Sequence, residues 1–396
     1  MEGGAARTKA EARGTGISSR SFRGRHGGGE HFIAVEVPAA LDFTKQLSLL
    51  EDRYQAARKA LDLGPETAVF RRVFLSDVMN QAAPVRNSRL AGDVPGSPVA
   101  VSIVQQAPLS GAKLALLAYH VASPDAVVKT RLGPRHVLMT KNGVRHLWST
   151  RLCAGDDRGA ADSAAQTREV FDDLIAVLKD QGGTLRDNCV RTWIYLKDVD
   201  VFYQGMVDSR RALFAREGLT SDTHFIASTG IEGACAHRYD LVAMDAYSVL
   251  DLAPRQVSYL NDYERLCPTA AYNVTFERAT RIAYADRAQL FISGTASIDR
   301  EGQVLHPGDV LRQLERALGN VEALLKAGRA SLRDMMYFIV YLRDPTDHAR
   351  VAAYLRERFA ELPTLIVQGA VCRPDWLVEV EGVGVARHDD PALPAF

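Results

Sequence analysis

The sequence predicts an α+β protein made of three tandem modules, each a β-sheet with two helices on one face. The first observation is a helical pattern: apolar residues recur at intervals of three and four over 47–61, as on one face of a helix. The second is repetition, because the same intervals return over 311–325 and a third helix of this kind covers 170–178. The third is that each of these helices precedes a short turn and then a strand.

The three predicted strands are rich in β-branched and aromatic residues and end in polar ones. They read AVFRRVFLSDV, CVRTWIYLKDV and MMYFIVYLRDP, with Phe74, Tyr195 and Tyr341 at matching positions. Two further strands are expected in each module after a second helix, which we place near 77–90, 200–216 and 345–359. A sheet with helices on one face leaves its other face uncovered. We therefore expect the three sheets to pack around a common axis as an intramolecular pseudo-trimer.

The expected domain organisation follows these repeats. Residues 1–30 are rich in Gly and Arg and show no hydrophobic period, so we expect a disordered tail there. The rest is divided into a degenerate module at 31–130, a second module at 131–250, a linker with a hairpin at 251–269, a third module at 270–387 and a C-terminal tail at 388–396.

Composition excludes several classes of function. Lys plus Arg and Asp plus Glu both number 48, so no overall field attracts nucleic acid or an anionic membrane. No apolar stretch is long enough to span a membrane, and we expect a cytoplasmic protein. The five cysteines are scattered without a C-x-x-C pair, which argues against a disulfide framework and against a zinc site. We expect no metal and no cofactor.

The third repeat contains the motifs SGTASID, HPGDVLRQLERALGNVEALL, IVYLRDP and VCRPDWLVEVEG. Together these resemble the Rid family, also called YjgF or endoribonuclease L-PSP proteins. That family forms homotrimers of one chorismate-mutase-like module with active clefts between subunits, so the resemblance implies that three Rid-like modules replace three subunits here. We expect a monomeric pseudo-trimer, and a higher oligomer stays open.

Within this family the third repeat is most similar to the chorismatases, in its GTAS loop, its HPGDV-like turn, its Y-x-R strand end and its V-C-R-x-x-x-L-V-E strand pair. The resemblance implies a small anionic substrate and a cofactor-independent hydrolase. Such an enzyme cleaves the enolpyruvyl ether of chorismate, or of a close relative, to pyruvate and a hydroxybenzoate or dihydroxycyclohexadiene carboxylate.

Two alternatives remain open from the sequence. A Rid-type imine or enamine deaminase carries an Arg in a P-x-R-[ST] setting before the penultimate strand, and this chain has Thr364 there. A small-molecule binding protein without catalysis would fit three decayed modules. Glu379 and Cys372, present in one copy alone, argue against uniform decay.

Glu379 is the predicted general acid. The repeats align it with Ala115 and Ala243, so the module does not require a carboxylate at this position. Protonation of an enol ether needs a carboxylic acid that stays protonated near neutral pH, and burial on a strand raises the pKa of Glu in this way. Pairing with a neighbouring Arg is the structural alternative. Glu381 lies on the same strand face, and both interpretations are open for it.

Cys372 and Arg343 are further candidates. The resemblance implies that Cys372 touches the substrate ring and, in some chorismatases, attacks an arene oxide on the way to 3-hydroxybenzoate. A buried inert thiol is the alternative, and Arg373 would favour a thiolate if the two side chains met. Arg343 is expected to bind a substrate carboxylate, although polar strand ends are usual in the other repeats. Tyr341, of the same Y-x-R strand end, is included in the predicted substrate site.

A loop of small residues, Gly294, Thr295 and Ala296, is expected to let a ligand approach backbone N–H groups. Arg278, in a motif that precedes the chorismatase domain, is a second expected carboxylate ligand. Because Rid sites are formed by two adjacent modules, STGIEG at 228–233 and RTWIY at 191–195 are expected near a cleft. Trp193 and Tyr195 within RTWIY are expected in the core.

Overall fold

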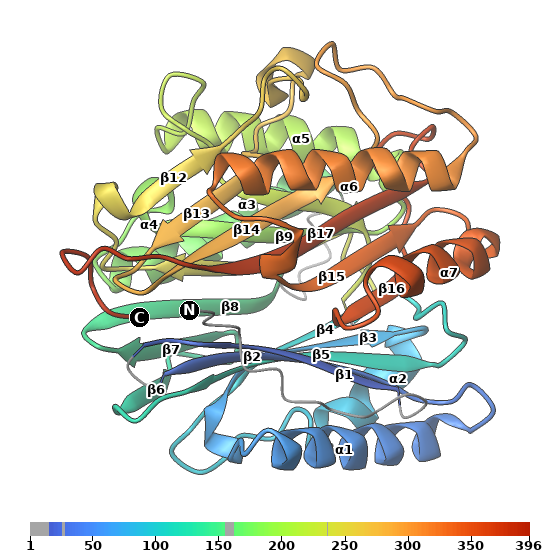
Figure 1. Ribbon diagram of the computed structural model, residues 1–396. Helices are drawn as coiled ribbons and strands as arrows, with labels where there is room; N and C mark the ends of the chain where they lie inside the picture. Colours follow the sequence, from blue (N-terminus) through green and yellow to red (C-terminus); the bar gives the residue numbers. More distant parts are fainter. Residues whose placement is uncertain (1–15, 26–27, 155–161, 236) are drawn as a thin grey trace, which may run out of the picture.

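The computed structural model describes residues 16–25, 28–154, 162–235 and 237–396, and three β-sheets organise them (Figure 1). The first sheet, with its helices, is called the first module. Its strands are β1 (Ile17–Arg23), β2 (Gly29–Glu36), β3 (Ala68–Leu75), β4 (Ala100–Gln105) and β5 (Leu114–Ala122), and its helices are α1 (Phe43–Ala60) and α2 (Val78–Arg86).

The second and third modules each have six strands. The second contains β6 (Val127–Arg131), β7 (His136–Lys141), β8 (Val144–Cys153), β9 (Cys189–Leu196), β10 (Ala227–Glu232) and β11 (Val242–Val249), with α3 (Ser163–Asp180), α4 (Leu185–Asn188) and α5 (Val199–Arg216). The third contains β12 (Val257–Leu260), β13 (Ala279–Ala283), β14 (Arg287–Thr295), β15 (Met335–Leu342), β16 (Thr364–Gln368) and β17 (Val378–Arg387), with α6 (Val310–Ala327) and α7 (His348–Arg358).

The same strand order occurs in all three sheets and confirms the predicted α+β fold. The first sheet has the order β1-β2-β5-β3-β4, which recurs as β7-β8-β11-β9-β10 and as β13-β14-β17-β15-β16. The additional strands β6 and β12 lie at sheet edges. The first helix of each module, α1, α3 or α6, begins after an aspartate N-cap that accepts a backbone N–H three residues later, and the three caps are Asp42, Asp162 and Asp309.

Strand register identifies equivalent positions in the modules. The landmark residues of the first expected strand pair as Phe74 with Ala115, Tyr195 with Ala243 and Tyr341 with Glu379. The positions two residues away pair as Arg72 with Leu117, Trp193 with Asp245 and Ile339 with Glu381. The structure therefore agrees with the alignment of Glu379 to two alanines.

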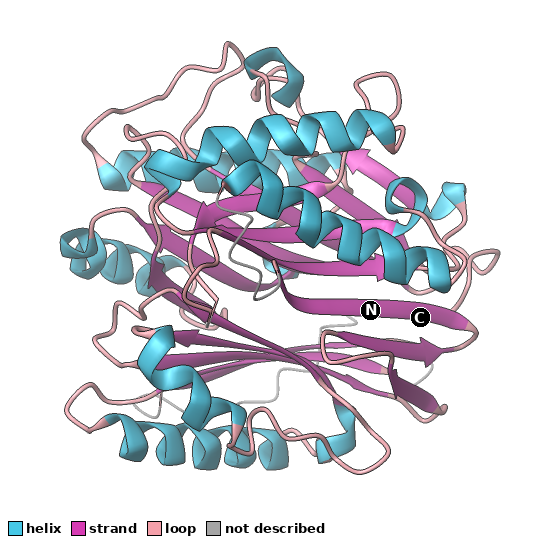
Figure 2. Cartoon of the chain, turned by 180° about the vertical axis from the view of Figure 1, so that it is seen from behind, coloured by secondary structure: helices cyan, strands magenta, loops and turns pink. Residues whose placement is uncertain are grey.

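The three sheets turn their helix-free faces toward one another. Figure 1 shows α1 below the first sheet, on the side away from the other two, and Figure 2 shows the same arrangement from behind. Aromatic side chains of different modules meet in the middle: the ring centroids of Phe32 and Tyr337 lie 5.3 Å apart, and those of Tyr247 and Phe291 lie 5.2 Å apart. This shared aromatic core replaces the helices that would otherwise cover these faces.

Three equivalent backbone hydrogen bonds join the modules in a ring. In each of them the N–H of the last residue of an edge strand donates to a backbone carbonyl of the next module. The bonds are Gln105 N–H to Ala234 O at 2.7 Å, Glu232 N–H to Ala370 O at 3.1 Å and Gln368 N–H to Ala107 O at 2.8 Å. The ring is closed because the third module returns to the first.

One predicted boundary, that of the expected tail, is wrong, and the expected linker with a hairpin contributes a strand to the third module. Within the expected tail at 1–30, β1 pairs antiparallel with β2, and Phe22 packs under the guanidinium of Arg287, 4.9 Å from the ring centroid. Arg287 is far away in sequence and most of β2 follows residue 30, so the composition of residues 1–30 gives no sign of these partners; residues 1–15 and 26–27 lie outside the described residues. Within the expected linker at 251–269, β12 pairs with β13 and belongs to the third sheet.

Two smaller observations complete the fold. The expected C-terminal tail at 388–396 packs Leu393 and Phe396 into the protein, where they are 7% and 5% exposed. Among the residues that the structure describes, no helix is long and apolar enough to cross a membrane.

Candidate functional site

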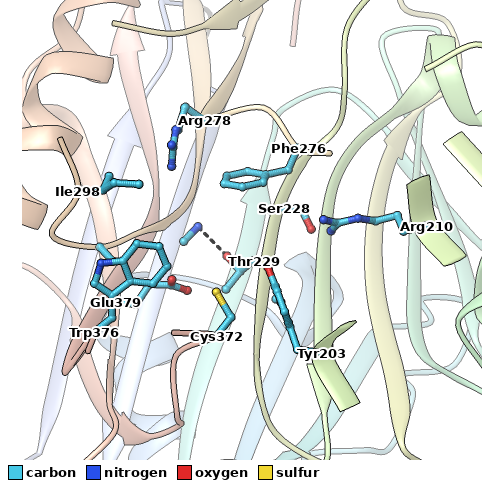
Figure 3. Close-up of a pocket in the computed structure, with 13 residues that line it drawn as sticks. Tyr203, Arg210, Ser228, Thr229, Phe276, Arg278, Ile298, Cys372, Trp376 and Glu379 are labelled. Atoms are coloured by element: carbon cyan, nitrogen blue, oxygen red, sulfur yellow. Dashed lines mark hydrogen bonds between the residues drawn. The ribbon is translucent and has the colours of Figure 1, made fainter. Parts of the chain in front are cut away.

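A pocket lies where the second module meets the third (Figure 3). The isolated bridge between Ile231 and Val371 brings β10 of the second module against the turn that precedes β17. The second module, the segment before β13 and the third module all contribute side chains. The lining residues are Tyr203, Arg210, Ser228, Thr229, Gly230, Phe276, Arg278, Gly294, Ala296, Ile298, Cys372, Trp376 and Glu379.

Glu379, on β17, presents a buried carboxyl group to this pocket and is 6% exposed. Its Oε1 atom has no hydrogen-bond partner among the described residues. Burial raises its pKa from 4.5 to about 8, the like charge of Glu381 adds to this, and Arg191 and Arg278 oppose it more weakly. Glu379 is therefore predominantly a carboxylic acid at neutral pH, as the general-acid hypothesis requires.

Gly294 lies directly against Glu379. A Cβ atom at position 294 would stand 2.2 Å from Glu379 Oε1 and 2.7 Å from its carboxyl carbon. The N–H of Gly294 donates to Thr229 Oγ1 at 2.9 Å. The expected role of this N–H, donation to a ligand, is therefore wrong; the small residue instead makes room for the carboxyl group of Glu379.

Glu381, two residues along β17, is held quite differently. Five side chains contact its carboxylate oxygens, and we call this carboxylate together with them the Glu381 cluster. The contacting atoms are Arg191 Nη2 at 2.6 Å, Trp193 Nε1 at 3.0 Å, Tyr341 Oη at 3.0 Å, Arg72 Nη1 at 3.7 Å and the hydroxyl of Thr229. The cluster joins residues of all three modules in the protein interior. It supports the structural interpretation of Glu381 and places RTWIY at the interface rather than in the pocket.

Cys372 lines the pocket as a thiol. Burial raises its pKa to about 12, with Glu379 adding to the shift, and Tyr203 hydrogen-bonds to it. Arg373 opposes the shift only weakly, because its Nη1 donates to Gly302 O at 2.8 Å and its guanidinium lies over Trp376. Arg373 thus lowers the pKa of Cys372, as expected, but burial outweighs it and Cys372 stays a thiol.

Arg343 and Tyr341 do not line the pocket, which corrects their predicted place in it. Arg343 forms two hydrogen bonds to Asp200 of α5, at 2.8 and 2.9 Å, and donates to Val371 O at 2.6 Å. It thereby fixes the backbone immediately before Cys372. Tyr341 is fully buried and donates to Glu381.

Of the other predicted site residues, some line the pocket and one does not. Ala296 and Arg278 line the pocket, and Arg278 Nη2 donates to Cys267 O at 2.9 Å. Thr295 does not; it is buried and its hydroxyl donates to Ser293 O at 2.8 Å. From the second module, STGIEG contributes Ser228, Thr229 and Gly230, which agrees with a site formed by two modules.

Sequence reasoning missed the contribution of α5. Tyr203, Met206, Arg210 and Phe214 follow one another at helical spacing, so Arg210 lies on an otherwise apolar helix face and is 2% exposed. Its Nε donates to Thr275 Oγ1 at 3.2 Å. An arginine on a buried helix face is a signal that could have identified it. Phe276, Ile298 and Trp376 were also missed, because apolar residues of a pocket look like ordinary core in a sequence.

Within the described part of the chain, no group of three or more His, Cys, Asp and Glu side chains could hold a metal ion. The titratable side chains that line the pocket are Glu379, Cys372, Tyr203, Arg210 and Arg278.

Comparison with known proteins identifies relatives. Residues 274–386 match the family described as endoribonuclease L-PSP. The 3-hydroxybenzoate synthase of Streptomyces hygroscopicus is 29% identical over 257 residues, which is 59% of this chain and 73% of the synthase. A RutC family protein of Pyrococcus abyssi is 33% identical over 96 residues, which is 24% of this chain and 76% of that protein.

A crystal structure of a chorismatase has a TM-score of 0.61 to this chain at 19% identity, and the match covers 81% of this chain and 94% of that one. The two proteins share a fold. Together with the RutC relative and the match of the third module, this shows that the chain belongs to the Rid family of endoribonuclease L-PSP and RutC proteins.

Proposed function

We propose that this protein hydrolyses the enolpyruvyl ether of chorismate, or of a close relative, to pyruvate and a hydroxybenzoate or dihydroxycyclohexadiene carboxylate. The similarity to a 3-hydroxybenzoate synthase and the fold shared with a chorismatase support this substrate class. The observation that carries the proposal is Glu379, a buried carboxylic acid with a pKa of about 8 in a pocket between two modules.

Glu379 supplies the proton for the first step. Its transfer to the methylene carbon of the enolpyruvyl group leaves a carboxylate on Glu379 and an oxocarbenium ion on the substrate. Water adds to this cation and its proton returns to Glu379. The hemiketal then loses the ring alcohol, which gives pyruvate and the dihydroxycyclohexadiene carboxylate. A hydroxybenzoate contains one water molecule fewer than this diol, so that product forms without net uptake of water, by capture of the cation by the ring hydroxyl in place of water. An acid with a pKa near the working pH suits this cycle, because it must both donate and regain a proton.

Arg210 and Arg278 lie on different walls of the pocket, as Figure 3 shows. Chorismate carries one carboxylate on its ring and one on its side chain. We assign one of these carboxylates to each guanidinium group, since such pairs are the strongest charge-assisted hydrogen bonds available here. A substrate with a single carboxylate, such as the enamine of a Rid deaminase, would use one of the two.

Cys372 is expected to select the product. The thiol lies beside Glu379 and is kept neutral by burial, so it contacts the substrate ring without competing for the substrate's carboxylates. Replacement by Ala is expected to change the ratio of hydroxybenzoate to dihydroxycyclohexadiene carboxylate while pyruvate release continues.

The experiment is a chorismate assay in which pyruvate is followed with lactate dehydrogenase and ring products by chromatography. Glu379→Gln is expected to reduce pyruvate release by about 100-fold or more, the usual contribution of a positioned acid. Glu36→Gln is the control, because burial also raises the pKa of Glu36, yet this residue lies in the first module outside the pocket.

Absence of pyruvate from the unmodified protein, or equal rates in Glu379→Gln, would overturn the assignment. Ammonia release from an enamine substrate, without activity on chorismate, would favour the deaminase alternative.

A further inference from the structure

We propose that Glu381 is a positioning residue: its buried charge, held by the second module through Arg191 and Thr229, acts together with burial to keep Glu379 in the acid form. The catalytic consequence rests on the proposed function, whereas the effect on the protonation of Glu379 does not.

The two side chains are close and share one face of β17. Residues two apart on a strand have their Cα atoms about 7 Å apart and point the same way. Both are buried, with exposures of 6% for Glu379 and 1% for Glu381. In a medium of low polarizability, two negative charges at this separation disfavour each other strongly, so one group stays protonated.

Hydrogen bonding distinguishes the two carboxyl groups. Arg191, Trp193 and Tyr341 all donate to Glu381. Glu379 Oε1 has no hydrogen-bond partner within the described ranges. A carboxylate is stabilised by donors, and an environment without them favours the acid. Two carboxyl groups in such different surroundings take different roles, as in other pairs of titrating groups.

Thr229 links the two halves of this arrangement. Its hydroxyl donates to Glu381 and its oxygen accepts from Arg191 and from Gly294 N–H. Gly294 is the residue that leaves room for the carboxyl group of Glu379. The second module therefore holds the charge of Glu381 and the backbone beside Glu379 through one side chain.

A purely structural role for Glu381 is the competing explanation, and the chain contains its matched control. Asp245, at the equivalent position of the second module, accepts from Tyr195 at 2.9 Å, from Arg72 at 3.3 Å and from Ser102. Ala243 stands where Glu379 would be. Asp245 thus joins two modules without an acid beside it.

The test compares Glu381→Gln with Asp245→Asn by infrared difference spectroscopy, which follows the carbonyl stretch of a protonated carboxyl group as pH is varied. Glu379→Gln identifies the band. Glu381→Gln is expected to lower the titration midpoint of Glu379 by about one pH unit or more, since a neighbouring negative charge is removed. Asp245→Asn is expected to leave it in place. An unchanged midpoint in Glu381→Gln, or an equal shift in Asp245→Asn, would overturn the proposal.

A second variant keeps the test decisive if Glu381→Gln does not fold because Arg191 loses its partner. Arg191→Met combined with Glu381→Gln removes buried charges of both signs. Its midpoint should still fall, by less, because Glu381 affects Glu379 more than Arg191 does. An unchanged or raised midpoint would contradict the proposal. The infrared reading needs no substrate, so a protein inactive on chorismate that shows the shift would refute only the proposed function.

Discussion

The interface between the first and second modules and the interface between the second and third are built on the same plan. Each has a buried carboxylate that accepts from a tyrosine and from a small hydroxyl residue of the preceding module: Asp245 with Tyr195 and Ser102, and Glu381 with Tyr341 and Thr229. Register makes these residues equivalent pair by pair. The shared cluster explains how modules join.

The two interfaces differ two residues before this carboxylate on the same strand. In the third module Glu379 lies against Gly294, whereas the equivalent positions of the second module hold Ala243 and Arg151. Arg151 has a φ of 56° and its N–H donates to Asp245 at 2.9 Å. The comparison teaches that a buried carboxylate can join two modules whether or not a protonated carboxyl group lies beside it. It also indicates that Glu379 needs a glycine at position 294, because a side chain there would occupy the space of its carboxyl group.

The largest expected effect is on the interface without the acid. Asp245→Ala leaves the guanidinium of Arg72, 1% exposed, with Glu381 at 3.7 Å as its remaining charged partner. Removing one member of a buried ion pair usually costs about 3–5 kcal/mol. Urea denaturation measures the loss. Asp52→Ala, which removes an exposed partner of Arg89, is the control and should cost about 0–1 kcal/mol. Equal losses would show that Asp245 does not hold the modules together.

The second expected effect is that Glu379 makes the free energy of unfolding depend on pH. Its pKa is about 8 when folded, against an ordinary value of 4.5. Between these values the unfolded chain releases the proton and the folded chain keeps it, so Glu379 makes the free energy of unfolding fall as pH rises from about 4.5 to 8. Above pH 8 the folded protein bears the full cost of a buried, ionised Glu379.

Glu379→Gln should remove that penalty. The variant and the unmodified protein are expected to have similar stability near the lower end of the window. At pH values above its upper end, the variant should be more stable by on the order of 5 kcal/mol, which is the difference between the two pKa values converted at about 1.4 kcal/mol per unit. Denaturant midpoints measured in pairs at each pH cancel the titration of all other groups. A constant difference across the range would mean that Glu379 is charged in the folded protein.

Sequence alone predicted the parts of this comparison that repetition reveals. The contrast of Glu379 with two alanines can be read from three aligned copies, and Gly294 stands out as one of the small residues of the GTAS loop. The partners of these residues could not be predicted in the same way. Arg343 pairs with Asp200 and Arg210 reaches the pocket because α5 packs there, and no local pattern states which helix face meets which module.

The same limit explains the remaining errors. The strand β1 exists because β2 pairs with it, and this partner is invisible in the composition of residues 1–30. The protonation of Cys372 depends on burial between modules, whereas its neighbour Arg373 in sequence is engaged elsewhere. Periodicity and repetition in the sequence predict the module to which a residue belongs. The packing between modules determines the partners and the protonation state of its side chain.

The smallest expected effect tests whether Gly294 and Glu379 form a coupled pair. A methyl group at position 294 would collide with the carboxyl group of Glu379, which can turn aside because it ends a flexible side chain. Gly294→Ala should therefore cost only about 1 kcal/mol of stability, at the low end for overpacking. It should also reduce turnover by about 100-fold, because the acid is displaced.

A double-mutant cycle separates this collision from a general effect of alanine. In a Glu379→Ala background the close neighbour that remains for a Cβ atom at position 294 is Thr229 Cγ2 at 3.1 Å. Gly294→Ala should therefore cost less stability there than in the unmodified protein, which gives a coupling of up to about 1 kcal/mol. That background reproduces the second module, where Ala243 faces the larger Arg151. Arg151→Ala is the control in both backgrounds and should show no coupling to Glu379. If Gly294→Ala costs the same with and without Glu379, the glycine serves the backbone rather than the acid.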